Sequence, residues 1–367
     1  MKKKFGFGCM RLPMIDETVD REQFTKMVDT FMSEGFNYFD TAQVYIKGQS
    51  ETELKACLTS RYPRDQYVLT NKLSQSLFEK EEDILPFFED QLAKTGVEYF
   101  DYYLMHALTS NYYKKFEQCH AFEIAQELKR QGKIKHIGMS FHDTADVLDT
   151  ILSEHPEIEI VQLQFNYVDY NDPTIQSRAN YEVCEKYNKQ VIVMEPCKGG
   201  GLINLPQKAK EIFNTAGGSY ASYAIRFAAS FPLVVMVLSG MSNMEQMEEN
   251  ISFMKDFQPF TEEEHAMIDT VRTILVNDDT IQCTACRYCI DGCPQKISIP
   301  DLFASYNQKK QFNDFNSNIY YLNNTERKGL GKASDCIQCG KCETICPQHL
   351  PIRKYLKQVA EVFETEK

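Results

Sequence analysis

The stretch Cys283-Thr-Ala-Cys286-Arg-Tyr-Cys289-Ile-Asp-Gly-Cys293-Pro294 recurs near the end of the chain as Cys336-Ile-Gln-Cys339-Gly-Lys-Cys342-Glu-Thr-Ile-Cys346-Pro347. Both stretches have the spacing C-x2-C-x2-C-x3-C-P. In such runs, three closely spaced thiolates bind three irons of one cubane, and the cysteine before proline ligates the other cluster. The spacing therefore predicts two [4Fe-4S] clusters. The ligands of the first are Cys283, Cys286, Cys289 and Cys346, and those of the second are Cys336, Cys339, Cys342 and Cys293.

This run is typical of bacterial two-cluster ferredoxins, and neither a zinc site nor a set of disulfides fits it as well. A zinc site needs four ligands, usually as two pairs, which gives no reason for four cysteines and a proline in both halves. Disulfides need an oxidising compartment. The cysteines outside the runs have no ligand spacing, which favours free thiols in a reducing compartment; they are Cys9, Cys57, Cys119, Cys184 and Cys197. Residues 294–335 form a long insertion between the runs, with an aromatic, amide-rich stretch at 312–321.

The composition is that of an acidic globular protein. The chain has 367 residues, of which 43% are hydrophobic and 25% charged, as in ordinary globular domains. Its net charge of -12 argues against a nucleic-acid partner. The apolar run after Met1-Lys-Lys-Lys ends by Arg11, too early for a signal peptide, and no stretch reaches the ~20 apolar residues of a membrane span. We therefore expect a cytoplasmic protein without membrane or nucleic-acid partners.

Short apolar runs alternate with longer helix-like segments from residue 5 to about residue 240, which predicts parallel strands joined by crossover helices. The eight candidate strands are Phe5–Phe7, Phe36–Asp40, Tyr67–Lys72, Tyr102–His106, Ile134–Met139, Ile160–Gln164, Val191–Met194 and Val234–Leu238. The helical candidates between them are Arg21–Glu34, Glu51–Ser60, Glu82–Gly96, Phe116–Gln131, Ala145–Glu154, Arg178–Tyr187 and Tyr220–Ala229. A further helix is expected at Thr261–Leu275.

Eight such strands fit a (β/α)8 TIM barrel, which typically has ~250 residues. An open doubly wound sheet usually begins with a glycine-rich dinucleotide turn, and Gly6-Phe-Gly-Cys-Met-Arg11 lacks the third glycine. The predicted fold class is thus α/β: a TIM barrel at residues 1–275, followed by a small bacterial ferredoxin-like iron–sulfur domain at 276–367.

Several predicted strands end on a polar residue. They are Asp40, Lys72, His106, Ser140 just past the fifth strand, and Gln164. In a barrel the carboxyl ends of all strands converge on one mouth, where the active site lies. Each residue taken singly has a structural explanation, such as capping a turn or pairing on the surface. Their occurrence at successive strand ends favours a shared site.

An acid, a lysine, a histidine and a tyrosine at one mouth suit carbonyl reduction. A hydride delivered to the carbonyl carbon leaves an alkoxide that must be protonated. Tyr45 would donate this proton, Lys72 would lower the pKa of Tyr45, and Asp40 would anchor Lys72. His106 would hydrogen-bond the carbonyl oxygen and orient the substrate.

Asp40-Thr-Ala-x-x-Tyr45, Lys72 and His106 resemble the catalytic tetrad of the aldo-keto reductases. The resemblance runs over most of residues 5–255, and with the cysteine runs the chain looks like the subgroup fused to a 4Fe-4S ferredoxin domain. It implies a nicotinamide nucleotide, NAD or NADP, with Ser140 and Gln164 at the carboxamide. A helix starting near Asn243 would aim its N-terminal amides at phosphate, or would only pack. The residues implied around the rest of the nucleotide are Ser239, Gly240, Met241, Asn243, Gln246, Glu249 and Asn250.

The chain departs from the family pattern in three places. Phe141 stands where asparagine normally follows the carboxamide serine, and Met194 and Glu195 stand where an aromatic residue normally stacks on nicotinamide. Gly240 and Gln246 occupy positions where a lysine or arginine usually binds the 2'-phosphate, and this weakens the case for NADP without establishing NAD. The loop Lys198–Gly201 either cradles a phosphate or is a flexible turn.

The fusion predicts an oxidoreductase that interconverts a small carbonyl compound and its alcohol. Because each cubane accepts one electron, the two clusters would relay electrons to or from an external carrier of the ferredoxin or flavodoxin type. The alternative is an electron-transfer or partner-docking iron–sulfur protein whose barrel is catalytically idle. The missing cations at positions 240 and 246 and the departure at Phe141 keep this alternative open.

Overall fold

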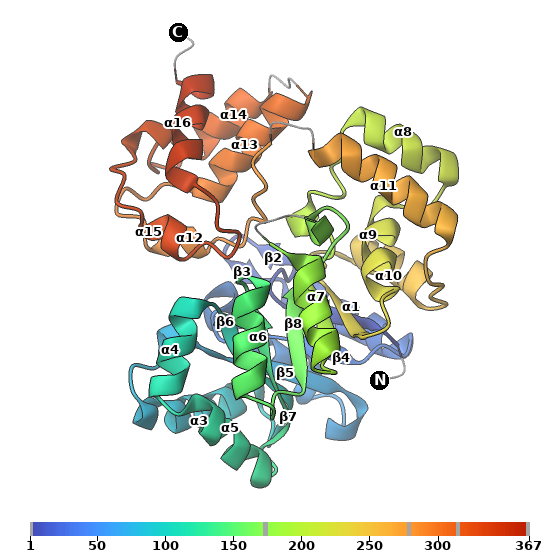
Figure 1. Cartoon of the computed structure of the whole chain (residues 1–367), viewed down its shortest axis with the longest axis vertical. Helices are drawn as coiled ribbons and strands as arrows, with labels where there is room; N and C mark the ends of the chain where they lie inside the picture. The colour runs from blue at the N-terminus through green and yellow to red at the C-terminus, as the bar shows by residue number, and fades with distance from the viewer. Residues whose placement is uncertain (1–2, 172–174, 277–279, 313–315, 365–367) are drawn as a thin grey trace. The chain divides into compact units, whose positions relative to one another are not determined.

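The computed structural model describes residues 3–171, 175–276, 280–312 and 316–364 (Figure 1). The chain forms two compact units. The first is Met1–Pro196 with Ala221–Phe260, and the second is Cys197–Tyr220 with Thr261–Lys367. Two segments that the sequence assigned to the barrel domain, 197–220 and 261–275, therefore group with the cysteine runs. The predicted domain boundary at residue 275 stays a prediction.

In the described part of the first unit, eight parallel strands close a barrel in the order β1, β10, β9, β8, β7, β6, β5, β4. Their bounds are β1 Phe5–Gly8, β4 Tyr38–Asp40, β5 Val68–Ser74, β6 Phe100–Leu108, β7 Ile134–Phe141, β8 Ile160–Gln164, β9 Gln190–Met194 and β10 Val234–Ser239. The predicted barrel is confirmed. The strand ends differ from prediction by no more than about two residues, which is the usual uncertainty of element boundaries. The hairpin of β2, Met14–Ile15, and β3, Thr18–Val19, was not predicted.

The helices that accompany the strands agree with the sequence pattern except at two places. They are α1 Arg21–Ser33, α2 Gln49–Leu54, α3 Ile84–Thr95, α4 Ser110–Gln118, α5 Ala121–Arg130, α6 Ala145–Glu154, α7 Ser177–Lys186, α9 Tyr220–Ala229 and α10 Met244–Met254. The single helix predicted at Phe116–Gln131 is wrong. His120 has a φ of 48°, a left-handed conformation that cannot continue a helix, so α4 and α5 are separate. At the second place, α2 is continued directly by a π-helix at Lys55–Thr59.

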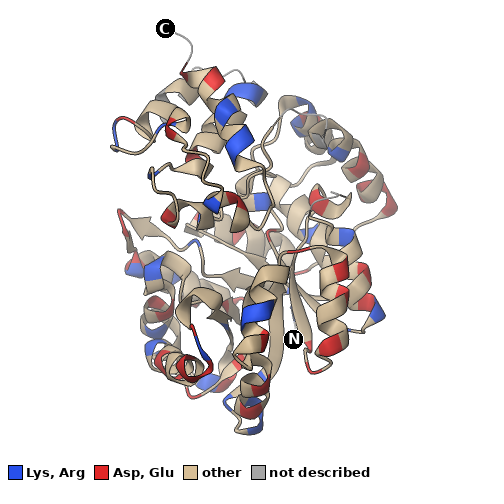
Figure 2. Cartoon of the chain, turned by 60° about the vertical axis from the view of Figure 1, so that its left-hand side comes forward, with Lys and Arg blue, Asp and Glu red and all other residues tan. Residues whose placement is uncertain are grey.

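Alternate residues of each strand fill the barrel interior. One interior layer is formed by Tyr38, Leu104, Ile160, Ile192, Met236 and Leu238. Gly138 leaves room for this layer, because a Cβ there would lie 2.5 Å from Cγ2 of Ile160. Side chains two residues apart on a strand face the same way. The next inward position of β4, β6 and β8 is therefore Asp40, His106 and Gln162, at the C-terminal mouth. Acidic and basic residues are interspersed along the outer helices (Figure 2).

The second unit is helical in its described residues. Its helices are α8 Gln207–Ala216, α11 Glu262–Val276, α12 Tyr288–Asp291, α13 Ile299–Phe312, α14 Asn316–Asn323, α15 Lys341–Thr344 and α16 Ile352–Phe363. The unpredicted α8 packs against α11. Helix α16 buries Ile352, Leu356 and Val359, one face of a helix at 3.6 residues per turn, in a core that includes Phe303 of α13.

The long insertion between the runs supplies α13 and α14. Residues 313–315 of its aromatic, amide-rich stretch lie outside the described residues. No helix in the described residues is both long and apolar enough to cross a membrane.

Candidate active site and cysteine cavity

Asp40, Tyr45 and Lys72 meet at the barrel mouth, with His106 beside them. The Lys72 ammonium donates to Oδ1 of Asp40 at 2.5 Å, to the Thr41 carbonyl at 2.9 Å and to Oη of Tyr45 at 3.0 Å. The rings of Tyr45 and His106 lie edge to face with centroids 5.9 Å apart. All four residues are buried, and Lys72 is fully inaccessible. The structure thus brings together the four residues predicted to be catalytic.

Burial dominates the ionisation of this group. It raises the pKa of Tyr45 well above 10, and the charge of Asp40 adds to the shift. Burial also lowers the pKa of Lys72 and raises that of Asp40, while the attraction between the two charges opposes both shifts. The net shift of the Tyr45 pKa is upward because desolvation of the phenol is its largest cause, and the prediction that Lys72 lowers this pKa stays a prediction. The Tyr45 phenol is protonated at neutral pH.

These shifts predict the pH dependence of carbonyl reduction. A proton donor loses activity as the pH rises through its pKa, and the Tyr45 phenol stays protonated well above neutral pH. The pKa of His106 lies well below 6.5, because of burial and then the nearby Lys72 charge, so its ring stays neutral in mild acid. We expect kcat/KM for reduction to show no limb from either residue between about pH 6.5 and pH 9. A descending limb with an apparent pKa near 8 that Tyr45→Phe abolishes would contradict this assignment.

Ser74 and Gln162 belong to the same polar layer, although neither was predicted from the sequence. The Ser74 hydroxyl lies 2.6 Å from Nδ1 of His106, and Gln162 donates to Oδ2 of Asp40 at 3.0 Å. If the Ser74 hydroxyl donates to Nδ1, the proton of the neutral ring lies on Nε2, where it can be donated to a carbonyl oxygen. The signal was the period of two along a strand: Ser74 follows Lys72, and Gln162 precedes Gln164, on the same face.

Removing the Asp40 carboxylate should destabilise the barrel strongly. Asp40→Ala leaves the inaccessible Lys72 ammonium without its counter-ion, and breaking a buried pair in this way typically costs about 3–5 kcal/mol. The measurement is the free energy of unfolding of the barrel by chemical denaturation. Asp149→Ala is the control, because Asp149 pairs with Lys186 at 2.6 Å on the surface, and an exposed pair contributes less than about 1 kcal/mol. Equal losses in the two variants would contradict the buried ion pair.

The residues predicted at the nicotinamide end are buried and hydrogen-bonded. The Ser140 hydroxyl accepts from the Ala107 amide at 2.7 Å and keeps its own proton for another acceptor. The Gln164 amide donates to Asp169 at 2.8 Å. Phe141, which replaces the usual asparagine, is also buried.

The residues predicted to bind the phosphates and the adenine lie before and within the first turns of α10. The Asn243 side chain caps this helix by accepting from the Gln246 amide at 2.9 Å, and the Gln246 side chain accepts from the Ser242 amide at 2.8 Å. Asn250 donates to the Ser239 hydroxyl at 3.2 Å. Of the remaining predicted residues, Gly240 and Glu249 are exposed. Met241 is buried in the core, so its side chain serves packing.

Two charges near this segment were not predicted. A Cβ on Gly240 would lie 3.3 Å from Cβ of Arg11, so the aliphatic part of a basic side chain passes beside the position that lacks a cation. The Arg11 guanidinium also lies 3.7 Å from the Glu195 carboxylate. Both charges shift the pKa of Tyr45, by less than burial and the Asp40 charge do. Glu195 raises this pKa and Arg11 lowers it. The sequence signal was their position, just after β1 and β9.

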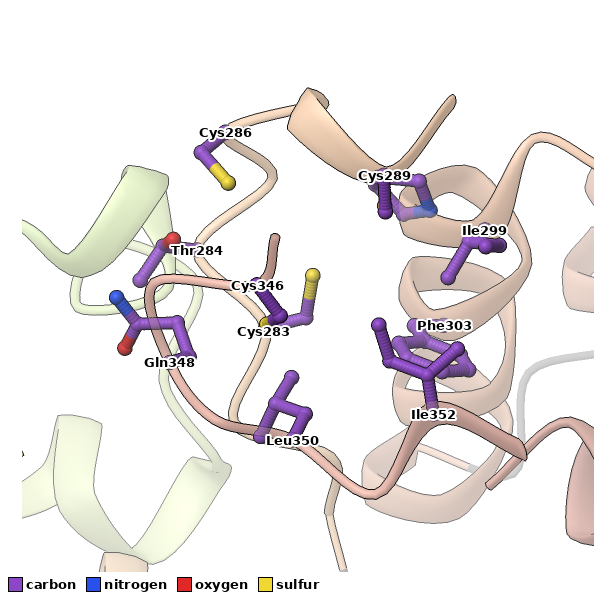
Figure 3. A pocket seen from close by; sticks show the side chains of 11 residues that line it. Cys283, Thr284, Cys286, Cys289, Ile299, Phe303, Cys346, Gln348, Leu350 and Ile352 are labelled. Carbon is purple, nitrogen blue, oxygen red and sulfur yellow. The ribbon is translucent and has the colours of Figure 1, made fainter. Parts of the chain in front are cut away.

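In the second unit, the first predicted set of ligands surrounds one cavity. Cys283, Cys286, Cys289 and Cys346 lie around it, with Ile299, Phe303 and Ile352 along one wall (Figure 3). The lining is completed by Thr284, Pro300, Gln348 and Leu350, so no described lining residue is charged. Among the described residues, no three His, Cys, Asp or Glu side chains converge closely enough to hold a single metal ion. Four thiols around an apolar cavity fit the donor set of a cubane.

Cys346 of the second run lines the same cavity as the first three cysteines of the first run, and the crossing of the fourth cysteine between two clusters stays a prediction. Burial raises the pKa of Cys289, and the charges of Cys286, Cys283, Cys346 and Cys342 add to the shift, so thiols of both runs lie near it. Burial raises the pKa of Cys342 to about 11, with further contributions from Glu343, Cys336 and Cys293. Cys293, from the first run, thus lies close enough to act on the second.

The loop at Lys198–Gly201 packs against the first cysteine run. Gly199 has a φ of 64°, and a Cβ there would lie 2.3 Å from the Thr284 carbonyl oxygen. Only glycine allows this approach. Lys198 is buried. The close packing explains one glycine of the loop without invoking a phosphate.

Comparison with known proteins agrees with this geometry. The model of the aldo/keto reductase family matches residues 4–273, most of the chain. The chain belongs to the aldo/keto reductase family. A second model, the 4Fe-4S dicluster domain, matches residues 282–350. The predicted fusion of an aldo-keto reductase with a C-terminal iron–sulfur domain is thereby confirmed.

Relatives of this aldo-keto reductase match a little under three quarters of its chain. The uncharacterized oxidoreductase YtbE of Bacillus subtilis is 24% identical over 269 residues, covering 73% of this chain and 88% of that protein. The 7-acetyl-epi-neemfruitin B aldo-keto reductase of Melia azedarach is 27% identical over 285 residues, covering 71% and 82%. A solved aldo/keto reductase of Klebsiella pneumoniae, in complex with NADP and acetate, has a TM-score of 0.60 at 19% identity, covering 73% and 91%. At that identity, the structural likeness shows the fold alone.

Proposed function

We propose that this protein interconverts a small carbonyl compound and its alcohol with a nicotinamide nucleotide, and that its C-terminal unit passes electrons to or from an external one-electron carrier. The observation that carries the proposal is the Lys72 ammonium, which joins Asp40 at 2.5 Å to the Tyr45 hydroxyl at 3.0 Å. A protonated phenol beside a cation is suited to give a proton to a developing alkoxide.

The residues of the barrel mouth have distinct roles in this reaction. Tyr45 gives its hydroxyl proton to the substrate oxygen as the alkoxide forms, and it takes the proton back in the oxidative direction. Lys72 stabilises the phenolate that remains, and Asp40 holds Lys72 in place. His106 donates from Nε2 to the carbonyl oxygen, with Ser74 fixing its tautomer. When bound, the nicotinamide supplies or accepts the hydride.

The proposed nucleotide site uses residues around the same mouth. Ser140 and Gln164 bind the carboxamide, and the amides at the start of α10 with its Asn243 cap face a phosphate. Arg11, beside Gly240, supplies a positive charge that positions 240 and 246 lack. The remaining proposed contacts are Ser239, Gly240, Met241, Gln246, Glu249 and Asn250. The Arg11 guanidinium also lies near the Glu195 carboxylate, so its positive charge does not decide between NAD and NADP. Titration with both nucleotides decides between them.

The C-terminal unit holds the two proposed clusters on the two crossed cysteine sets. When bound, each cubane stores one electron, so a pair of them matches the two electrons of a hydride. The carrier is proposed to be a one-electron protein of the ferredoxin or flavodoxin type. The free thiols elsewhere in the chain suit a reducing compartment such as the cytoplasm.

Anaerobic titration with NADH and NADPH, followed by turnover of a panel of aldehydes and ketones, tests the barrel reaction. We expect one nucleotide to bind and at least one carbonyl compound to be reduced. Failure of both nucleotides to bind would favour the alternative function, an electron-transfer protein with an idle barrel. The relay is tested by following the clusters by EPR during turnover, and clusters that stay oxidised would contradict it.

A further inference from the structure

The two cysteine sets differ in their exposure. All thirteen cysteines of the chain are among the described residues, and Cys339 of the second set is the one that is exposed. In the first set, Cys289 and Cys346 are buried and the cavity between the ligands is walled by apolar side chains. Cys283 and Cys286 of the first set and Cys336 and Cys293 of the second are partly exposed, so the second set differs by the exposure of Cys339.

The exposed side of the second run carries an apolar side chain. Ile337 lies between Cys336 and Cys339 and is 59% exposed, which is high for an isoleucine. Helix α16 lies beside this loop, because Arg353 reaches the Gln338 carbonyl oxygen at 3.5 Å and lies 3.8 Å from the position of a Cβ on Gly340.

Three exposed lysines lie at the end of this loop and on α16. Lys341 begins α15 directly after the loop, and Lys354 and Lys357 lie on the solvent side of α16. None of the three forms an ion pair with a described residue. Glu343 is neutralised by Arg353 at 2.7 Å. Asp335 accepts the Lys332 amide at 2.8 Å and keeps its charge, and the exposed Glu361 lies one turn after Lys357 on α16. Lys341, Lys354 and Lys357 therefore outnumber Asp335 and Glu361 here, on a chain whose net charge is -12.

Building on the proposed electron relay, we propose that Ile337, Lys341, Lys354 and Lys357 form the docking surface for a small acidic ferredoxin. Opposite charges steer the approach and fix its orientation, and the exposed apolar side chain supplies the dry centre of the contact. Cys339 brings a cluster ligand to this surface. One electron passes per encounter between the partner's iron–sulfur centre and the second cluster of this chain. The donor is oxidised and the acceptor reduced by one electron, and no bond or proton moves. The proposed cluster and the iron–sulfur centre of a ferredoxin each exchange one electron at a time.

The test uses the full chain with its clusters, prepared anaerobically, and a purified acidic ferredoxin as the probe. The Kd is measured by calorimetry at low and high salt. We expect the charge reversal Lys341→Glu with Lys354→Glu to weaken binding at low salt by about tenfold or more, with a smaller effect at high salt because ions screen exposed charges. Lys133→Glu with Lys208→Glu makes the same change of charge elsewhere and should leave the Kd unchanged. Ile337→Ser should weaken binding at both salt concentrations.

Iron and acid-labile sulfide in each variant, with EPR after dithionite reduction, separate this proposal from the proposed function. If wild type and variants hold reducible clusters but the reversed variant binds ferredoxin as tightly as wild type, the docking surface is wrong and the relay stands. Binding of a flavodoxin in place of the ferredoxin would also overturn the assignment of the partner. Absence of clusters from the wild type would overturn the proposed function itself.

Discussion

Replacing Tyr45 by Phe is expected to lower kcat/KM for carbonyl reduction by about 100-fold to 10,000-fold, the usual contribution of a positioned general acid. The variant loses only the hydroxyl that lies 3.0 Å from the Lys72 ammonium. Its ring can still pack against His106. Nucleotide binding and iron content should therefore be unchanged, and the loss should lie in kcat. Steady-state kinetics with the best carbonyl substrate, together with a nucleotide titration, make the measurement.

Tyr62→Phe is the matched control for this variant. The Tyr62 hydroxyl donates to Asp29 at 2.5 Å near the surface, away from the barrel mouth. Its removal should leave kcat/KM within about twofold of wild type, since a surface substitution rarely matters. Full reductase activity in Tyr45→Phe would show that another group protonates the substrate, and the assignment of the mouth residues would fail.

Replacing Cys346 by Ala is expected to remove one cluster of two, leaving about four irons per chain in place of about eight. The crossed ligand sets make a sharper prediction for pairs of substitutions. Cys286 and Cys346 line the same cavity, so the variant with both replaced should lose no more iron than either single variant. Cys286→Ala with Cys293→Ala touches both sets and should leave almost no iron.

The opposite pattern would contradict the crossing. If each run held its own cluster, Cys286→Ala with Cys293→Ala would keep about four irons, and Cys286→Ala with Cys346→Ala would lose both clusters. Cys184→Ala is the control, because this thiol is buried in the barrel far along the sequence from either run. It should keep its full iron content. Iron is counted on anaerobically purified protein.

The sequence predicted much of the fold because its two strongest signals are local. Each strand is a short apolar run, and the polar residue at its end marks the mouth; Asp40, Lys72 and His106 were found in this way. The fourth member, Tyr45, required the chemistry as well as the position. The spacing alone predicts that Cys346 crosses to the first run, and Cys346 lies at the cavity that this run lines.

Features that depend on neighbours in space could not be predicted in this way. The pairing of Ser74 with His106 joins two strands, and that of Gln162 with Asp40 crosses the barrel. The upward net shift of the Tyr45 pKa depends mainly on burial, which the sequence pattern does not give. The break at His120 is a single left-handed residue, and the helical period continues across it. Likewise, Gly199 meets Thr284 only in the folded chain.

The proposed function depends on one chain that joins a hydride-transferring barrel to two iron cubanes. The most direct test is to purify the full chain without oxygen and to count iron and acid-labile sulfide per polypeptide. We predict about eight of each, in a brown protein whose clusters dithionite reduces. A colourless protein with neither iron nor labile sulfide would contradict the proposal.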